Sequence, residues 1–152
     1  MVIRIKNLQR SKRLNLRKVR RDLAKAAAML CLEDSELSIA FTGSMTMKSL
    51  NAHYRSIRKD TDVLSFPMDA PSGRFPASGH PLPLILGDIV ISVPRAAQQA
   101  RACGISLQEE LRRLLMHGLL HLTGYDHEKG QHRKALMKRK EQELLNALQE
   151  MD

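Results

Sequence analysis

Apolar residues recur along the chain with two kinds of spacing, and each kind predicts one kind of element. Short apolar runs bounded by turn residues are typical of strands, and longer stretches with apolar residues three or four apart are typical of helices. Strands are expected at 2–7, 36–42, 63–66 and 84–93. Helices are expected at 14–32, 44–55, 94–103, 106–124 and 131–149. The two kinds mix without strict alternation, which predicts an α+β fold with helices around a small sheet.

Certain residues mark where these helices begin and end. Ser106 and Glu109 have the spacing of a capping box, and Gly124 is a natural C-terminal stop for the helix that follows them. Ser44 is expected to cap the second helix. The stretch 68–83 is rich in proline and glycine and is therefore expected to be a loop.

Length and composition limit the class of protein. A chain of 152 residues with 43% hydrophobic residues is expected to form a single domain, 1–152. The N-terminus is charged from Arg4 onward, unlike a signal peptide, and no stretch is long enough to span a bilayer. A cytoplasmic protein without a membrane partner is expected. Cys31 and Cys103 occur in no paired motif and are expected to be buried free thiols.

The net charge of +9 is concentrated at one end of the chain. Ten Lys and Arg within 1–25, against the single acid Asp22, account for all of it, and the remaining fifteen basic and fifteen acidic residues cancel. A localised positive surface favours a polyanionic partner. Aromatic residues are few, with two Tyr, three Phe and no Trp. A nucleic acid would therefore be held mainly through phosphates, with strong salt dependence.

Three histidines within eleven residues predict a metal site. His117 and His121 are four apart on a predicted helix, so their side chains lie on the same face. Gly124 allows the chain to turn back and bring His127 to the same ion. Three imidazoles with an open fourth position are typical of a catalytic zinc rather than a structural one.

The same histidine spacing occurs in zinc proteases with the motif His-Glu-x-x-His-x-x-Gly-x-x-His. In those enzymes the glutamate is the general base, and Gly118 occupies its position here. Peptide hydrolysis by that route therefore lacks its base. A metal that lowers the pKa of a bound water to about 7 could still act on a phosphodiester.

Three blocks of residues, within 51–67, 86–92 and 117–127, resemble the bacterial YbeY family of single-strand-specific endoribonucleases. The first contains Asn51, Tyr54, Arg55 and the run Thr-Asp-Val-Leu-Ser-Phe-Pro at 61–67. The second is Leu-Gly-Asp-Ile-Val-Ile-Ser, and the third is the histidine block with its Gly-Tyr-Asp-His ending. One departure occurs at 58–60, where Arg-Lys-Asp replaces the usual Asp-x-Pro, so a less rigid loop is expected.

The resemblance implies an α+β fold with a small mixed sheet and a metal-binding helix like that of zinc proteases. It implies one zinc ion per chain at His117, His121 and His127, and a catalytic arginine at Arg55. Arginine suits this role because a guanidinium can pair with two phosphate oxygens and stabilise charge that develops at phosphorus. The resemblance implies that the substrate is RNA and that no DNA is bound. It also implies a role in 16S rRNA 3′-end maturation and in ribosome quality control.

Two other functions stay open on the sequence. One is a zinc peptidase that uses the same three histidines, with a carboxylate supplied from elsewhere in the chain. The other is a non-catalytic ribosome-binding factor in which zinc stabilises the fold. For a nuclease, the sequence also does not distinguish between two attacking groups. These are a metal hydroxide and the 2′-hydroxyl of the RNA.

Overall fold

The computed structural model describes residues 1–68, 84–124 and 130–152. The elements, in chain order, are β1 (Val2–Asn7), α1 (Leu16–Met29), β2 (Ser35–Thr42), α2 (Ser44–Arg55), β3 (Val63–Pro67), β4 (Leu84–Ser92), α3 (Val93–Cys103), α4 (Leu107–Leu122) and α5 (Gln131–Glu150). They form a small mixed sheet packed with helices, so the predicted α+β class is confirmed. The loop predicted at 68–83 falls almost entirely outside the described residues.

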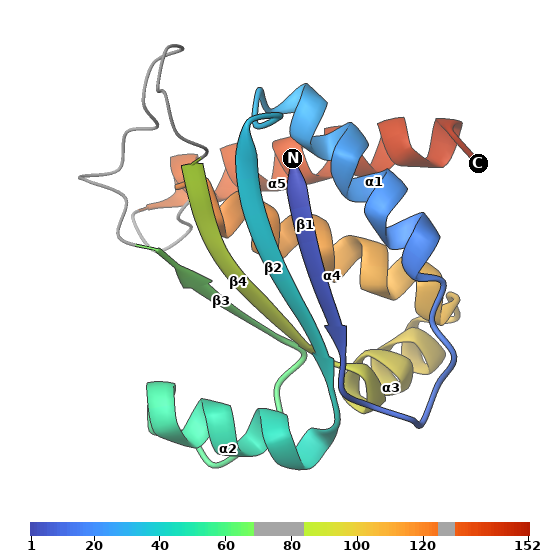
Figure 1. Cartoon of the computed structure of the whole chain (residues 1–152), viewed down its shortest axis with the longest axis vertical. Helices are drawn as coiled ribbons and strands as arrows, with labels where there is room; N and C mark the ends of the chain where they lie inside the picture. The colour runs from blue at the N-terminus through green and yellow to red at the C-terminus, as the bar shows by residue number, and fades with distance from the viewer. Residues whose placement is uncertain (69–83, 125–129) are drawn as a thin grey trace.

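The strands form one sheet in the order β1-β2-β4-β3. β1, β2 and β4 run parallel, and β3 pairs antiparallel to β4. Figure 1 shows α4 and α5 behind the sheet and α2 near the ends of the strands, on the side of β3. The chain crosses from β1 to the parallel β2 through α1, as a parallel pair requires.

The core lies between the sheet and helices α1, α4 and α5. Alternate strand residues point toward these helices, namely Ile3, Ile5, Leu37, Ile39, Phe41, Ile89 and Ile91. Helix α4 is the main partner, with Leu111, Leu114, Leu115, Met116, Leu119 and Leu122 in the same core. Each such side chain contributes about 1.5–3 kcal/mol when fully buried. A smaller cluster on the opposite face, Met47, Leu64 and Val90, attaches α2 to β3 and β4.

A bulge in β4 changes the direction of the residues that follow it. Glu36 pairs with Ile85 and Leu37 pairs with Gly87, so β4 has one extra residue at Leu86. Gly87 has a φ of +136°, and a Cβ there would lie 2.2 Å from the backbone oxygen of Phe66. Only glycine fits this position. Because of the extra residue, Asp88 points away from the core while Leu86 points into it.

The helix boundaries confirm most of the predicted caps. Ser106 and Glu109 form the full capping box at the start of α4, and Gly124 has the expected positive φ of +88°. The predicted cap at Ser44 is wrong. Gly43 is the N-cap of α2, and Ser44 is already the first helical residue. Helix α1 begins later than expected because the Asn15 side chain caps it by accepting from the Lys18 amide.

The prediction that both cysteines are buried is also wrong. Cys31 and Cys103 are free and exposed. Each occurs where a helix ends: Cys31 follows α1 with a φ of +57°, and Cys103 is the last residue of α3 before the left-handed cap Gly104. The apolar spacing of these helices has already ended there. Within the described ranges, no helix has both the length and the apolar character needed to cross a membrane.

A buried ion pair joins α1 to α4. Arg112 Nε donates to Asp22 Oδ2 at 2.9 Å, and the two residues are only 7% and 1% exposed. Asp152 adds a second carboxylate, which accepts from Arg112 Nη1 at 2.9 Å and from Arg21 Nη2 at 2.7 Å. The hydrogen bonds from Arg112 and Arg21 hold the pKa of Asp152 well below its usual range. The network connects α1, α4 and the residues after α5.

We expect Asp22→Asn to destabilise the protein by about 3 kcal/mol, because it leaves the buried Arg112 guanidinium without its one buried carboxylate partner among the described residues. Thermal and urea unfolding would measure the loss. Glu150→Gln, at the exposed end of α5, is the matched control and should change stability by less than about 0.5 kcal/mol. Equal unfolding midpoints for the two variants would contradict the role given to this ion pair.

Candidate functional site

Helix α4 brings two of the three predicted metal ligands together. The Nε2 atoms of His117 and His121 lie 3.0 Å apart, and the ring centroids are 4.6 Å apart. A zinc–nitrogen bond is about 2.0–2.1 Å long, so two nitrogens this close can bind the same ion. His127 lies outside the described residues. Among the residues that are described, no group of three or more His, Cys, Asp or Glu is arranged so that it could hold a metal ion.

The other ring nitrogen of His117 faces α5. Its Nδ1 lies 3.2 Å from Oε2 of Glu141, whose side chain is 17% exposed. The two nitrogens of His117 therefore have different surroundings: Nδ1 meets a carboxylate and Nε2 meets the second imidazole. This contact joins α4 and α5 at the level of the histidine pair.

A polar cluster lies one turn before His117 on α4. Glu110 is 1% exposed and accepts from Arg113 Nε at 3.0 Å. This hydrogen bond is the main cause that raises the pKa of Arg113. The Gln99 amide, oriented with its nitrogen toward the two carboxylates, donates to both Glu110 and Asp62 at 3.3 Å. Glu110 and Arg113 therefore both have hydrogen-bond partners within the fold.

Gly118 lets α4 approach the sheet closely. A Cβ at this position would lie 3.1 Å from Ile89 Cδ1 and 3.2 Å from Ser65 Oγ. Ser65 Oγ also lies 3.5 Å from the Gly118 carbonyl oxygen, at the limit of a hydrogen bond. In the zinc-protease motif this position holds the glutamate that acts as base. Here it faces the packed sheet, so the site has no room for that carboxylate.

Arg55 comes from the opposite face of the sheet. It is the last residue of α2 and is exposed. Helix α2 packs on β3 through Leu64, whereas Gly118 of α4 contacts β3 through Ser65, which points the other way. The described residues therefore do not assemble Arg55 with the histidine pair. The two helices therefore lie on opposite faces of β3, the last strand of the sheet that the described residues form.

The loop after α2 is held in spite of the missing proline. Asn51 is 4% exposed, and its Nδ2 donates to the carbonyl oxygen of Lys59 at 2.9 Å. The Ile57 amide donates to the Asn51 carbonyl oxygen at 3.3 Å. A single buried asparagine thus fixes the loop at two points. The expectation of a less rigid loop, drawn from the residues at 58–60, stays a prediction, and these two hydrogen bonds act against it.

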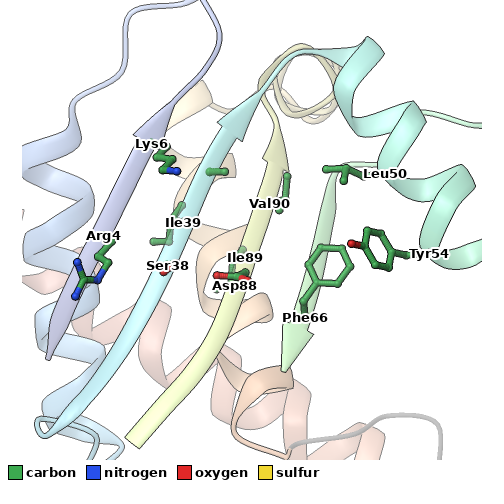
Figure 2. Close-up of a pocket in the computed structure, with 11 residues that line it drawn as sticks. Arg4, Lys6, Ser38, Ile39, Leu50, Tyr54, Phe66, Asp88, Ile89 and Val90 are labelled. Carbon is green, nitrogen blue, oxygen red and sulfur yellow. The ribbon is translucent and has the colours of Figure 1, made fainter. Parts of the chain in front are cut away.

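The face of the sheet turned away from the core carries a row of polar residues. The strand register places Arg4 beside Ser38, Ser38 beside Asp88, and Asp88 beside Phe66. Figure 2 shows this row, with Arg4 and Lys6 on one side and Phe66 on the other. We refer to it as the front face. The bulge at Leu86 is what turns Asp88 toward it.

A cavity of about 550 Å³ lies on the front face. Arg4 and Lys6 line one side, and Tyr54 of α2 and Phe66 of β3 line the other (Figure 2). The Tyr54 and Phe66 rings meet edge to face, with centroids 4.9 Å apart, and Tyr54 is 61% exposed. The cavity therefore combines cations with an exposed aromatic ring.

The basic N-terminal segment is divided between two roles. Four of its cations make internal contacts: Arg20 Nη1 donates to the Ile3 carbonyl oxygen at 2.6 Å, Lys18 and Arg21 pair with Asp152, and Arg4 lies 4.0 Å from a Glu36 carboxylate oxygen. Arg4 and Lys6 also line the front face. The positive charge counted in the sequence is thus only partly available to a polyanion.

Sequence reasoning missed two features of this region. Glu141 lies 24 residues after His117 and follows no motif spacing, so only the packing of α5 on α4 brings it there. The front-face row was partly predictable from the sequence, because side chains alternate along β1 and this places Arg4 and Lys6 on the same face of the sheet. The sequence did not predict that the row extends to Asp88, because the direction of this side chain depends on the bulge in β4.

Comparison with known proteins gives consistent matches. Residues 4–149 match the family described as Endoribonuclease YbeY. The Endoribonuclease YbeY of Aquifex aeolicus is 46% identical over 123 residues, which cover 78% of this chain and 77% of the relative. The protein of the same name from Bacillus cereus is 40% identical over 131 residues, with coverage of 85% and 83%.

A solved structure also matches. The solution structure of TM1509 from Thermotoga maritima superimposes with a TM-score of 0.65, at 22% sequence identity. The match covers 97% of this chain and 89% of that chain. At this identity the likeness concerns the fold alone.

We expect Gly118→Glu to destabilise the protein by about 1–3 kcal/mol or more, because the new side chain has no space against Ile89 and Ser65. It should also cleave no peptide, measured with a labelled unstructured peptide beside thermal unfolding. Gly118→Ala is the milder comparison, since the gain in helix propensity of about 1 kcal/mol offsets part of the crowding. A Gly118→Glu protein that folds like the wild type and hydrolyses the peptide would show that the site has room for this carboxylate, and would contradict the prediction.

Proposed function

The chain belongs to the YbeY family of endoribonucleases, and from this we propose that it is a zinc-dependent endoribonuclease that cleaves single-stranded RNA. We propose further that it acts in the cytoplasm, in 16S rRNA 3′-end maturation and ribosome quality control. The names of the relatives support RNA as the substrate. The zinc ion, the catalytic residue and the path of the RNA are argued from the geometry of the site.

The observation that carries the proposal is the convergence of two imidazoles. His117 and His121 direct their Nε2 atoms at each other across 3.0 Å from consecutive turns of one helix. We propose that these two residues and His127 hold one zinc ion per chain. The donor set fits, because neutral imidazole is a preferred zinc ligand and three such ligands leave a position for substrate or water. Bound there, zinc would supply a Lewis acid at a phosphoryl oxygen and an acidified water.

Arg55 is the proposed catalytic residue. Cleavage of a phosphodiester places extra negative charge on the oxygens around phosphorus, whether water or the 2′-hydroxyl attacks. A guanidinium can donate two parallel hydrogen bonds to those oxygens and stabilise them. Because α2 and α4 pack on opposite faces of β3, the last strand of the described sheet, we propose that the scissile phosphate binds at the outer edge of this strand.

The front face is the proposed path for the rest of the RNA. Arg4 and Lys6 can pair with phosphates, and the exposed ring of Tyr54 can stack on an unpaired base. Such stacking is worth about 1–3 kcal/mol per base and requires a single strand, because paired bases do not offer their faces. Asp88 adds an acceptor that can pair with a base edge. The cavity thus supports a preference for single-stranded substrate.

We expect His121→Ala to abolish both zinc binding and RNA cleavage, because it removes one of three ligands. Arg55→Ala should keep its zinc and lose roughly 10²–10³-fold in cleavage rate, as expected for removal of a donor to developing charge. Elemental analysis and cleavage of a labelled single-stranded RNA measure the two effects.

Arg101→Ala, an exposed arginine at the end of α3, controls for loss of a positive charge and should match the wild type in both assays. Loss of zinc from the Arg55→Ala protein would contradict the division of roles. Zinc binding without cleavage in the wild type would favour the non-catalytic ribosome-binding factor instead.

We expect the double variant Arg4→Ala and Lys6→Ala to bind single-stranded RNA more weakly at low salt. The slope of log affinity against log salt concentration should fall by about 0.7 for each phosphate that the protein no longer neutralises. Fluorescence anisotropy on zinc-free protein measures this while the RNA stays intact, with Arg101→Ala as the control. An unchanged slope would show that the RNA takes another path.

A further inference from the structure

The His117 ring has a polar neighbour at each of its nitrogens, and together these neighbours define its protonation pattern. Nδ1 lies 3.2 Å from Glu141 Oε2, and Nε2 lies 3.0 Å from Nε2 of His121. An ionised carboxylate offers only acceptors, so the hydrogen of a neutral His117 must be on Nδ1. Nε2 then presents its lone pair in the direction of His121. This is the tautomer that a metal bound through Nε2 requires.

We propose that Glu141 is a positioning residue for the metal site, and that it holds His117 in the tautomer and ring orientation that bind zinc. The proposal rests on the zinc site proposed above and adds a residue to it from a different helix. Carboxylates that accept from the outer nitrogen of a metal-ligating histidine fix its orientation and make it a stronger ligand. Glu141 would touch neither the ion nor the RNA and would act through His117.

The surroundings of Glu141 support this role over that of an ordinary surface carboxylate. Its side chain is 17% exposed, and the Arg113 guanidinium, itself hydrogen-bonded to the buried Glu110, interacts electrostatically with it. Glu143, two residues later on the same helix, is a useful contrast. Its side chain is 55% exposed, and it pairs with Lys140 within the helix at 3.4 Å.

The first test measures the tautomer directly in zinc-free protein. Long-range ¹H–¹⁵N NMR spectra distinguish a protonated from an unprotonated ring nitrogen. In the wild type, His117 should be protonated on Nδ1. Glu141→Ala should move His117 toward the Nε2-protonated form, whereas Glu143→Ala should leave it unchanged. A helix-packing contact alone would not produce this pattern, so an unchanged His117 spectrum in Glu141→Ala would overturn the proposal.

The second test measures affinity for Zn²⁺ by competition with a chromophoric chelator. Glu141→Ala should bind zinc roughly 10- to 100-fold more weakly than the wild type. Glu141→Gln should lose less, because its amide oxygen can still accept the hydrogen bond without the charge that strengthens it. Glu143→Ala and Glu143→Gln should bind like the wild type. Equal affinities for the wild type and both Glu141 variants would overturn the proposal.

The design separates this inference from the nuclease proposal. Wild-type protein that binds zinc but cleaves no RNA would overturn the nuclease function, and weaker binding by Glu141→Gln would still support the positioning role. If Glu141→Ala does not fold, as judged by circular dichroism of the zinc-free protein, the isosteric pair Glu141→Gln and Glu143→Gln decides. If Glu141→Gln alone binds zinc more weakly than the wild type, the proposal is supported. If Glu141→Gln and Glu143→Gln bind zinc equally well, the proposal is overturned.

Discussion

The close packing of α4 against the sheet is the constraint on which the rest of the structure depends. Gly118 allows the helix backbone to approach so near that a single Cβ would crowd Ile89 and Ser65. The turns on either side of this contact carry His117 and His121, so their backbone positions are fixed by the hydrophobic core and not by the metal. Loss of a metal from such a site need not unfold the domain, unlike loss from a zinc-stabilised fold. The same close contact excludes the carboxylate of a zinc protease.

The two faces of the sheet have different tasks in the proposed function. The covered face supplies the core and, through α4 and α5, the histidine pair and Glu141. The front face supplies cations, an exposed aromatic ring and an acidic side chain for the RNA. One extra residue in β4 separates these tasks, since without the bulge Asp88 would point into the core. The edge of β3 is where the two faces meet, and α2 carries Arg55 along one side of it.

Local features of the sequence predicted most of the elements and the closeness of two of the histidines. The helix boundaries at Ser106 and Gly124 and the pairing of the two histidines depend on residues within one or two turns, and all were confirmed. Features that depend on tertiary contacts were missed. No spacing pointed to Glu141 or to the internal use of the cations on α1, and Cys31 was misread because its exposure depends on where α1 ends. The catalytic role of Arg55 and the metal-binding roles of His117, His121 and His127 stay predictions, and His127 lies outside the described residues.

The central claim is that this chain binds one catalytic zinc ion, and a metal-reconstitution experiment tests it most directly. Protein treated with a chelator and then dialysed would be titrated with Zn²⁺, with bound metal and RNA cleavage followed in the same samples. We expect no cleavage without metal. Cleavage should return in proportion to the zinc added and saturate at one ion per chain, and the fold should stay intact throughout. Full cleavage by the metal-free protein, or no zinc bound at saturation, would contradict the central claim.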